Sequence, residues 1–310
     1  MQSYAFIFPG QGSQHAGMGK DLADNFKAAK IAFEEADDAL GFSLSRLCFE
    51  GPEEDLKLTA NTQPAILAAS VAALRVLREE SPITPSFLAG HSLGEYSALV
   101  ASGALDFADA LRTVRARGSY MQDAVPVGIG AMAAILGAEA DLLKEICAEA
   151  AQGEVVSPAN FNSPGQIVVA GHTGAVNRAI EIAKAKGLRK AMLLPVSAPF
   201  HCALMKPAAD RLARTLEPLT VNPLAAPVVS NVEAKPNSDA ARVKPLLIEQ
   251  VCAPVLWEQI IQNIVAQGVT NFVEIGPGKV LAGLVKRIDK EAACCNVQDA
   301  AGVKAITEVA

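Results

Sequence analysis

The feature of the sequence that most constrains the fold is a repeated alternation of short apolar runs with helical patterns. Apolar runs occupy residues 4–8, 87–89 and 272–275, and Pro9-Gly10 stops the first of them. Helical patterns lie at 62–78, at 106–123 and at 281–285. A further one follows the second apolar run and reaches residue 100. Strands that alternate with helices are typical of α/β proteins, so we predict this class rather than an all-α or all-β fold.

The middle of the chain has a different order of elements, because two of its strands follow one another without a helix between them. We expect strands at 131–136, 155–159, 166–170 and 191–196, and helices at 138–150 and 175–186. This βαββαβ order is that of the ferredoxin-like unit. It begins after Pro126 and ends before Pro199. We therefore predict a small domain of residues 127–197 inserted into a discontinuous larger domain of residues 1–126 and 198–310.

Composition excludes several classes of protein. With 51% hydrophobic residues and a net charge of −6 over 310 residues, the chain can bury a large core and is not intrinsically disordered. The acidic balance argues against a nucleic-acid partner. The most apolar uncharged stretch, 124–138, is shorter than the ~20 residues of a membrane span. No signal peptide is visible, and the six cysteines lack C-x-x-C spacing, so we expect a cytoplasmic protein with no metal and no membrane attachment.

A candidate nucleophile follows the second apolar run. Gly90-His91-Ser92-Leu93-Gly94 has the G-x-S-x-G pattern, with a strand before it and an amphipathic helix after it. A sharp strand-to-helix turn needs glycine on both sides of the serine, because side chains there would clash with the neighbouring strand and helix. We predict that Ser92 is a nucleophile. The alternative is a glycine-rich turn without chemistry.

Four histidines are available to activate that serine. His91 adjoins Ser92, and consecutive side chains at a tight turn diverge. His15 lies in the glycine-rich segment 10–19, and His172 follows a strand of the predicted insertion. His201 stands where the chain returns from the insertion to the larger domain, and such junctions are where sites collect. We predict that His201 is the general base, the alternative being a histidine with a structural role.

A third group should orient the imidazole of that base. The acidic candidates, none of them in an obvious loop at the end of a strand, are Asp106, Asp109, Asp123 and Asp210. A helix predicted over 243–251 must stop before Pro254, and its last carbonyls then lack helical partners. The backbone carbonyl of Gln250 is one of these, and we prefer it as the acceptor of the Nδ1 proton. The site would then be a Ser-His dyad.

An arginine on the predicted helix 106–123 lies at the edge of the apolar face. At about 100° per residue, Arg112 and Arg115 fall on or near the polar face, whereas Arg117 falls beside the arc that contains Val114 and Met121. A buried guanidinium needs an anionic partner. That partner is either an internal Asp or Glu or a carboxylate of the substrate, gripped bidentately. The second reading implies an acyl group that ends in a carboxylate.

The segment 4–18 supplies possible donors for an oxyanion. A strand that ends in Pro-Gly-Gln-Gly exposes backbone N–H groups at the same edge of the sheet as Ser92. The N–H groups of Gln11 and Leu93 could form an oxyanion hole, each worth about 3 kcal/mol in the transition state. The alternative is a glycine-rich loop that serves only as a turn.

Six motifs in order between residues 5 and 287 resemble one enzyme family. They are FPGQGSQ, GHSLGE, RARGSYMQ, SPANFNSPGQIVVAG, SAPFH and EIGPGKVL, and together they are similar to the malonyl-CoA:acyl carrier protein transacylases. The resemblance implies an α/β-hydrolase-like large domain with an inserted ferredoxin-like small domain. It also implies Ser92 as nucleophile, His201 as base and Arg117 on the malonyl carboxylate. The SAPFH motif favours malonyl over methylmalonyl.

The remaining roles come from the same resemblance. Gln11 and Leu93 would form the oxyanion hole, and the Gln250 carbonyl would orient His201. The side chains expected to line the substrate site are Arg117, Gln11, Met121, Asn160 and Asn162. The expected reaction is a ping-pong transfer of malonyl from coenzyme A to the phosphopantetheine thiol of acyl carrier protein for fatty acid synthesis, with no bound cofactor.

Acyl carrier proteins are acidic, so docking on a chain of net charge −6 requires a local basic patch. Candidates for it are Lys286, Arg287, Arg189 and Lys190, with Lys184 and Lys186 beside them. Two other functions share the Ser92 motif. A serine hydrolase is one, although a simple esterase has no use for a buried Arg117. A non-catalytic module that binds carrier protein is the other, although it would not need Ser92 and His201.

Overall fold

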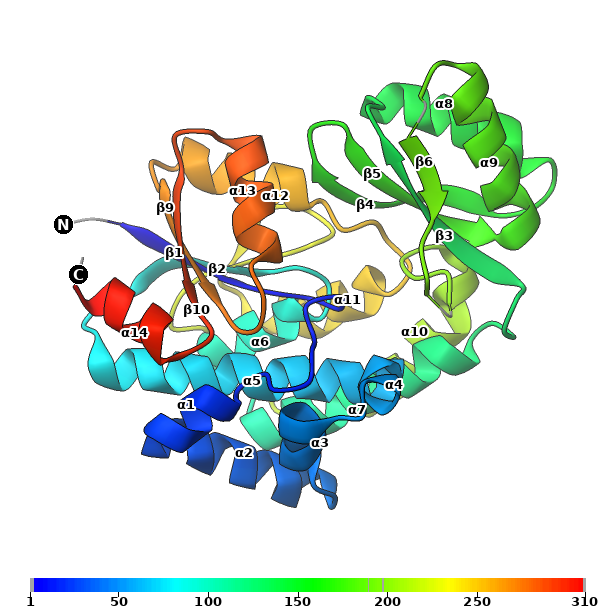
Figure 1. Cartoon of the computed structure of the whole chain (residues 1–310). Coiled ribbons are helices and arrows are strands. Elements are labelled where there is room, and N and C mark those ends of the chain that lie inside the picture. Colours follow the sequence, from blue (N-terminus) through cyan, green and yellow to red (C-terminus); the bar gives the residue numbers. More distant parts are fainter. Residues whose placement is uncertain (1–2, 189, 197, 309–310) are drawn as a thin grey trace.

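Two β-sheets organise the molecule (Figure 1), and the computed structural model describes residues 3–188, 190–196 and 198–308. The larger sheet has the order β10-β9-β1-β2-β7-β8 and the smaller has the order β4-β5-β3-β6. The strands of the larger sheet are Tyr4–Phe8 (β1), Pro85–Gly90 (β2), Val228–Val229 (β7), Pro236–Asn237 (β8), Asn271–Ile275 (β9) and Ala293–Val297 (β10). Those of the smaller sheet are Gly130–Leu136 (β3), Val156–Ser163 (β4), Gln166–His172 (β5) and Lys190–Leu193 (β6).

The centre of the larger sheet is parallel and buried on both faces. β1 pairs in parallel with β2 and β9, while β10 extends the sheet beyond β9. Alternate residues of β1 enter different cores, with Phe6 and Phe8 on one face and Ala5 and Ile7 on the other. A strand covered on both faces needs a continuous apolar run. The three predicted strands at 4–8, 87–89 and 272–275 are therefore confirmed.

Helices cover both faces of this sheet. Figure 1 shows α5 along one face with α2 and α7 beyond it, and α12 and α13 on the opposite face. The predicted helix 62–78 is confirmed and extends further at both ends, over Thr59–Glu80 (α5). The other helices around the larger sheet are Lys20–Asn25 (α1), Lys27–Leu40 (α2), Leu44–Glu50 (α3), Glu53–Lys57 (α4), Gly94–Ala101 (α6), Phe107–Asp123 (α7), Lys206–Leu216 (α10), Ala240–Gln250 (α11), Trp257–Ala266 (α12), Val280–Ile288 (α13) and Ala300–Thr307 (α14), with a 3₁₀ turn at Ala203–Met205.

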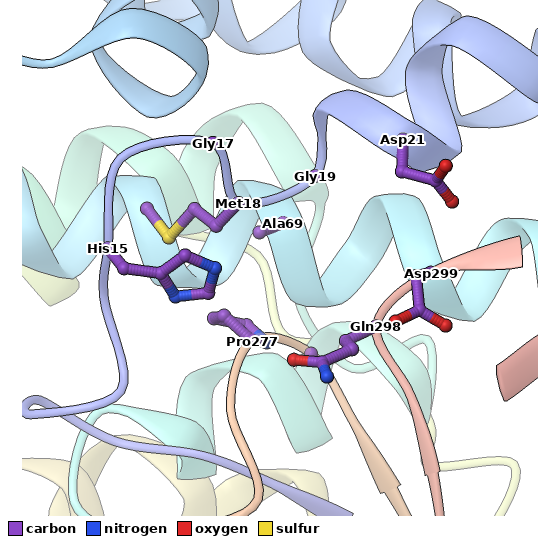
Figure 2. A pocket seen from close by; sticks show the side chains of 10 residues that line it. His15, Gly17, Met18, Gly19, Asp21, Ala69, Pro277, Gln298 and Asp299 are labelled. Atoms are coloured by element: carbon purple, nitrogen blue, oxygen red, sulfur yellow. The ribbon is translucent and has the colours of Figure 1, made fainter. Parts of the chain in front are cut away.

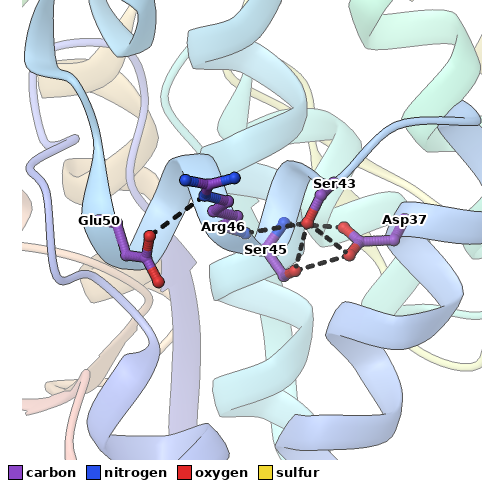
Figure 3. Close-up of polar contacts among 5 residues, drawn as sticks. All are labelled: Asp37, Ser43, Ser45, Arg46 and Glu50. Atoms are coloured by element: carbon purple, nitrogen blue, oxygen red, sulfur yellow. Dashed lines mark hydrogen bonds and ion pairs between the residues drawn. The ribbon is translucent and has the colours of Figure 1, made fainter.

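The junction of α2 and α3, far from the cavity described below, shows how polar side chains set the helix ends (Figure 3). The Asp37 carboxylate accepts hydrogen bonds from the Ser45 main-chain N–H at 2.7 Å and from its hydroxyl at 2.6 Å. Ser43 caps α3 by accepting the N–H of Arg46. These contacts satisfy donors that the first turn of a helix leaves open, so they stabilise the reversal between the two helices.

The smaller sheet is antiparallel throughout its described pairs, and its elements occur in the predicted order. β3 lies between β5 and β6, and β4 pairs with β5. The two helices packed on it are Ala140–Ala151 (α8) and Thr173–Ala185 (α9).

Two boundaries of the smaller sheet differ from the prediction by three or four residues, and the others by no more than two. β4 continues to Ser163, because the ladder with β5 runs on to the tight turn that joins them. β6 ends at Leu193 rather than at residue 196, since Pro195 has no N–H and the N–H of Val196 turns back to the carbonyl of Leu194.

The two sheets are joined by main-chain contacts. The N–H of Val255, in the segment after α11, donates to Ala159 O, and the N–H of Phe161 donates to Val255 O, both at 2.9 Å. In addition, Arg287 of α13 donates to Gln166 of β5 at 2.6 Å. These contacts fix the edge strand β4 beside the larger sheet. No helix in the described part of the chain is long and apolar enough to cross a membrane.

Candidate active site

The turn between β2 and α6 is as sharp as the G-x-S-x-G pattern predicts. Ser92 has a φ of 50°, in the left-handed region that residues other than glycine rarely adopt. A Cβ on Gly90 would lie 1.9 Å from the Gly94 carbonyl carbon, and one on Gly94 would lie 2.1 Å from Phe8 O. The turn therefore requires both glycines, and it presents Ser92 at the N-terminal end of α6.

Ser92, His201 and Gln250 form one hydrogen-bonded chain. Ser92 Oγ lies 2.7 Å from His201 Nε2, and His201 Nδ1 lies 2.8 Å from the Gln250 main-chain oxygen. A carbonyl oxygen only accepts hydrogen bonds, so Nδ1 carries the proton and the Nε2 lone pair faces the serine. The site thus has the geometry of the predicted dyad.

The four aspartates considered for the third position lie elsewhere. The Asp106 carboxylate caps α7, and Asp109 pairs with Arg112 of the same helix. Asp123 and Asp210 pair with Arg211 and Lys206 respectively. Each of these four carboxylates therefore has a partner other than His201.

The environment of His201 keeps its imidazole neutral. Burial, reinforced by the positive charge of Arg117, lowers the pKa of His201 to about 3. A neutral imidazole is the form that can accept a proton. The arrangement therefore provides a base that is ready at neutral pH.

Arg117 is buried, as the helical spacing predicts, with 1% of its surface exposed. Its guanidinium donates to Gln63 Oε1 at 2.8 Å, to Gln250 Oε1 at 2.9 Å and to Ser92 Oγ at 3.2 Å. No carboxylate lies within ion-pair distance of Arg117 among the residues that the structure describes. Its Nε has no hydrogen-bond partner within the described part of the chain. The guanidinium therefore reaches the serine with a donor still open.

These groups meet in a cavity of about 140 Å³ between the two sheets. The larger sheet and its helices contribute the reactive side chains, and the smaller sheet contributes Met132 and Asn160. The lining residues are Gln11, Gln63, His91, Ser92, Arg117, Met121, Met132, Asn160, Leu194, Val196, Phe200 and His201. The structure thus brings together most of the side chains that the sequence singled out.

Three predicted site residues do not line the cavity. Gln250 is fully buried, and its main-chain oxygen contacts His201. Leu93 is buried behind the turn, and its N–H precedes the first turn of α6. The side-chain oxygen of Asn162 lies 2.8 Å from His91 Nε2, so Asn162 contacts the turn and not the cavity. Gln11 follows Gly10. A Cβ on Gly10 would lie only 2.4 Å from His91 O, so the backbone at this point runs close against the turn.

Three buried polar residues of the site were not predicted. Gln63 holds Arg117, Asn231 accepts the Ser92 N–H at 2.7 Å and donates to Gly90 O at 2.7 Å, and Glu95 bonds to Gln250. One signal was available for Glu95, since it is a charged residue within the apolar helix 94–101. Nothing local distinguishes Asn231.

A second cavity, of about 220 Å³, lies on another side of the glycine-rich loop (Figure 2). His15 and Met18 face Pro277 and Gln298 across it, with Asp21 and Asp299 at one end. Within the described chain no group of three or more His, Cys, Asp or Glu side chains could hold a metal ion. His15 lines this second cavity and not the one that contains Ser92.

Comparison with known proteins gives a consistent result. The family described as "Acyl transferase domain" matches residues 5–306. The malonyl CoA-acyl carrier protein transacylase of Escherichia coli K12 is 52% identical over 288 residues, 93% of each chain. The structure of an acyl carrier protein S-malonyltransferase from Vibrio cholerae O1 biovar eltor has a TM-score of 0.97 at 51% identity, covering 98% of this chain and 100% of its own.

A further solved structure shows a malonyl-transacylase in complex with a type II PKS acyl-carrier protein. It has a TM-score of 0.97 and 48% identity, covering all of both chains. The regions that align with these relatives include every residue of the candidate site. The chain belongs to the acyl transferase domain family and, within it, to the malonyl CoA-acyl carrier protein transacylases.

Proposed function

We propose that this protein transfers a malonyl group from malonyl-CoA to the phosphopantetheine thiol of acyl carrier protein, through an acyl-enzyme on Ser92, and so supplies malonyl-carrier protein for fatty acid synthesis. One observation carries the proposal. Ser92 Oγ lies 2.7 Å from the base nitrogen of His201 and 3.2 Å from the guanidinium of Arg117. A nucleophile placed between a base and a buried cation suits an acyl group that carries its own carboxylate.

The first half-reaction forms the ester. His201 Nε2 takes the proton of Ser92 while Oγ attacks the thioester carbonyl carbon, and the Gln250 carbonyl stabilises the imidazolium through Nδ1. When the tetrahedral intermediate collapses, the carbon–sulfur bond breaks and His201 returns the proton to the departing coenzyme A sulfur. The second half-reaction is the same sequence in reverse, with the carrier-protein thiol as nucleophile. No cofactor enters either half.

The oxyanion of each intermediate is stabilised by main-chain donors. We assign these to the N–H groups of Leu93 and Gln11. Leu93 stands at the start of α6, where N–H groups have no helical acceptor and the helix dipole favours negative charge. Gln11 lines the cavity that contains Ser92. Each donor would lower the barrier by about 3 kcal/mol.

Selection of malonyl is assigned to Arg117. Gln63 and Gln250 orient its guanidinium, and its Nε and the side facing Ser92 remain for a carboxylate. Met121 and Asn160 line the same cavity and would contact the acyl chain. Asn162 acts instead through His91.

Intact mass after mixing with malonyl-CoA tests the reaction. We expect a stable malonyl adduct in the native protein, loss of that adduct in Ser92→Ala, and transfer of the group when carrier protein is added. Free malonate without a stable adduct would indicate a serine hydrolase. No adduct and no malonate would indicate a module that only binds carrier protein.

The fold follows the same proposal. We assign the larger sheet and its helices to an α/β-hydrolase-like domain of residues 1–126 and 198–310, and residues 127–197 to an inserted ferredoxin-like domain. The strand order β4-β5-β3-β6 of the smaller sheet supports this assignment, and all four strands lie within the insertion.

We also place the protein in the cytoplasm, because its six cysteines are free thiols.

We propose that carrier protein docks over Lys286, Arg287 and Lys190, all of which are exposed. Lys190 pairs with Leu136, which pairs with Gln166 on its other side, and Arg287 donates to Gln166. Lys190 and Gln166 are therefore two strand spacings, about 10 Å, apart across the sheet, and the Arg287 side chain reaches Gln166. Lys184 and Lys186 are engaged by Glu181 and Glu149, and Arg189 lies outside the described residues.

A charge-reversal variant separates docking from chemistry. Lys286→Glu with Arg287→Glu should lower kcat/KM for carrier protein by about tenfold or more, because electrostatic steering sets the association rate. Acylation by malonyl-CoA should stay unchanged. The matched control is Lys27→Glu with Lys30→Glu on α2, which should alter neither. Equal losses in both half-reactions would refute the docking surface.

A further inference from the structure

Glu95 is a buried carboxylate that the reaction above does not use. It lies on α6, three residues after the nucleophile, with 3% of its surface exposed. One oxygen, Oε2, accepts both of its hydrogen bonds, from Gln250 Nε2 at 2.7 Å and from the Asn231 main-chain N–H at 3.1 Å. A buried carboxylate is costly unless its charge is compensated. The positive charge that lowers its pKa is that of Arg117.

The Gln250 side chain joins these two charges. Its Nε2 donates to Glu95 and to the Ser92 main-chain oxygen at 2.9 Å, while its Oε1 accepts from Arg117. Only one orientation of the amide satisfies all three contacts, because the reverse orientation would set donors against the guanidinium and an oxygen against the carboxylate. Glu95 thereby fixes Gln250, whose backbone carbonyl also holds His201.

The electrostatics around Glu95 involve few other groups. Arg117 of α7 and Tyr96 of α6 are the ionisable side chains that interact with it within the described elements packed around α6. Burial raises the pKa of the Tyr96 phenol and lowers the pKa of His201 and His91, so all three are neutral at pH 7. Above the pKa of Glu95, which is about 7, the free site therefore contains one positive charge, on Arg117, and one negative charge, on Glu95.

Binding of a malonyl group adds a second carboxylate beside the same arginine. Two carboxylates near one cation repel each other in a site of low dielectric constant, and one of them then tends to bind a proton. Burial raises the pKa of Glu95 to about 7, so a modest further rise protonates it near neutral pH. Oε2 keeps both hydrogen bonds in that form, which leaves Oε1 to carry the proton.

We propose, on the basis of the function proposed above, that Glu95 is the internal counter-charge of Arg117, and that it takes up a proton from solvent when the malonyl carboxylate replaces it in that role. Glu95 is a positioning residue, since it acts through Gln250 and touches no reacting atom. The buried site then holds one negative charge against one positive charge both before and after acylation.

The experiment counts protons during a single round of acylation. Native protein is mixed with malonyl-CoA at pH 7.5 in weak buffer with a pH indicator, and intact mass is read from the same samples. We expect between about 0.5 and 1 proton taken up per acylated Ser92, after correction for ionisation of the released thiol. At pH 5.5 uptake should fall to about 0.1 or less, because Glu95 is already protonated.

Glu95→Gln is the informative variant, because one amide oxygen can accept both hydrogen bonds that Oε2 accepts. It should still form the adduct, with proton uptake reduced at least fivefold. Glu274→Gln is the matched control, since burial also raises the pKa of Glu274 to about 7 but that residue makes no contact with Arg117 or Gln250. Its uptake should equal that of native protein.

The outcomes separate the two proposals. An adduct that forms in native protein without proton uptake, or with the same uptake at pH 5.5 and 7.5, would overturn the inference and leave the transferase function intact. Undiminished uptake in Glu95→Gln would overturn it as well. No adduct in native protein would refute the proposed function itself, and the inference with it. The pH comparison uses native protein only, so it decides the matter even if Glu95→Gln fails to fold.

Discussion

The two junctions β2–α6 and β9–α13 are built alike and do different things. Each joins a parallel strand of the larger sheet to a helix through a glycine-containing turn, and each contains a buried glutamate whose pKa is raised to about 7 by burial. Close packing requires glycine in both, since a Cβ on Gly94 would lie 2.1 Å from the main-chain oxygen of Phe8 and one on Gly276 would lie 2.3 Å from the side-chain Oγ of Ser70. A strand–turn–helix junction with a close-packed glycine and a buried glutamate is therefore not by itself an active site.

The two glutamates differ in their partners. Glu274 accepts the N–H groups of Leu281 and Ala282, so its carboxylate caps the start of α13 within its own junction. Glu95 accepts from Gln250 and Asn231, which come from distant segments. The second junction forms a wall of the cavity in Figure 2 through Gly276 and Pro277, with no serine at the turn. The candidate active site forms at the first junction because side chains from other helices and segments reach its turn.

The largest expected effect removes the nucleophile from the first junction. Ser92→Ala should lower the acylation rate by about 10⁴-fold or more, because the hydroxyl forms the covalent bond. The matched change is Ser70→Ala on α5, whose side chain faces Gly276 of the second junction, and it deletes a buried hydroxyl that has no hydrogen-bond partner among the described residues. That variant should keep full activity and equal or slightly greater stability. Rates of adduct formation by mass spectrometry check both, and a strong loss in Ser70→Ala would break the comparison.

The next effect concerns selectivity rather than rate alone. Arg117→Ala should lower the ratio of kcat/KM for malonyl-CoA to that for acetyl-CoA by about 100-fold, because truncating one partner of a buried charge pair costs about 2–5 kcal/mol. Arg112→Ala, on the exposed face of the same helix, should leave the ratio unchanged. Competition between the two substrates measures it directly. An unchanged ratio in Arg117→Ala would remove its assigned role.

Sequence patterns of short range predicted much of this site. The glycines around Ser92 follow from the clash that any side chain would cause, and the burial of Arg117 follows from its position in the helical period. The end of α11 at Gln250 follows from Pro254. Each of these depends on neighbours within one or two turns, where spacing along the chain determines spacing in three dimensions.

The network beneath the nucleophile could not be predicted in this way. Gln250 and Glu95 are separated by 155 positions in the chain, and Asn231 and Glu95 by 136. No periodicity relates such residues, because their contact depends on how α11 and the segment after β7 pack against α6. Asn162 was expected in the cavity, but its side chain contacts His91. The pairing of β4 with β5 decides which way that side chain points, and local spacing does not predict this pairing either.

The smallest effect tests the glutamate of the second junction. Because the folded state raises the pKa of Glu274 from 4.5 to about 7, the unfolded chain loses this proton first as pH rises. The free energy of unfolding should therefore fall between pH 4.5 and 7, by up to about 1.4 kcal/mol per pH unit from this group. Glu274→Gln should flatten that decline. It should also cost about 1 kcal/mol at pH 5, because glutamine has only one accepting oxygen and its NH₂ donor would face the second main-chain N–H.

Urea unfolding at pH 5 and at pH 7.5 measures both consequences. The variant should be less stable than native protein at pH 5 and should match or exceed it at pH 7.5, with malonyl transfer unchanged. Glu95→Gln should flatten the same decline without the loss at pH 5, since both hydrogen bonds of Glu95 fall on one oxygen. Equal pH slopes in Glu274→Gln and native protein would mean that Glu274 is ionised in the folded state. Between pH 4.5 and 7, where Glu95 is protonated, the two glutamates would then differ in charge as well as in partners.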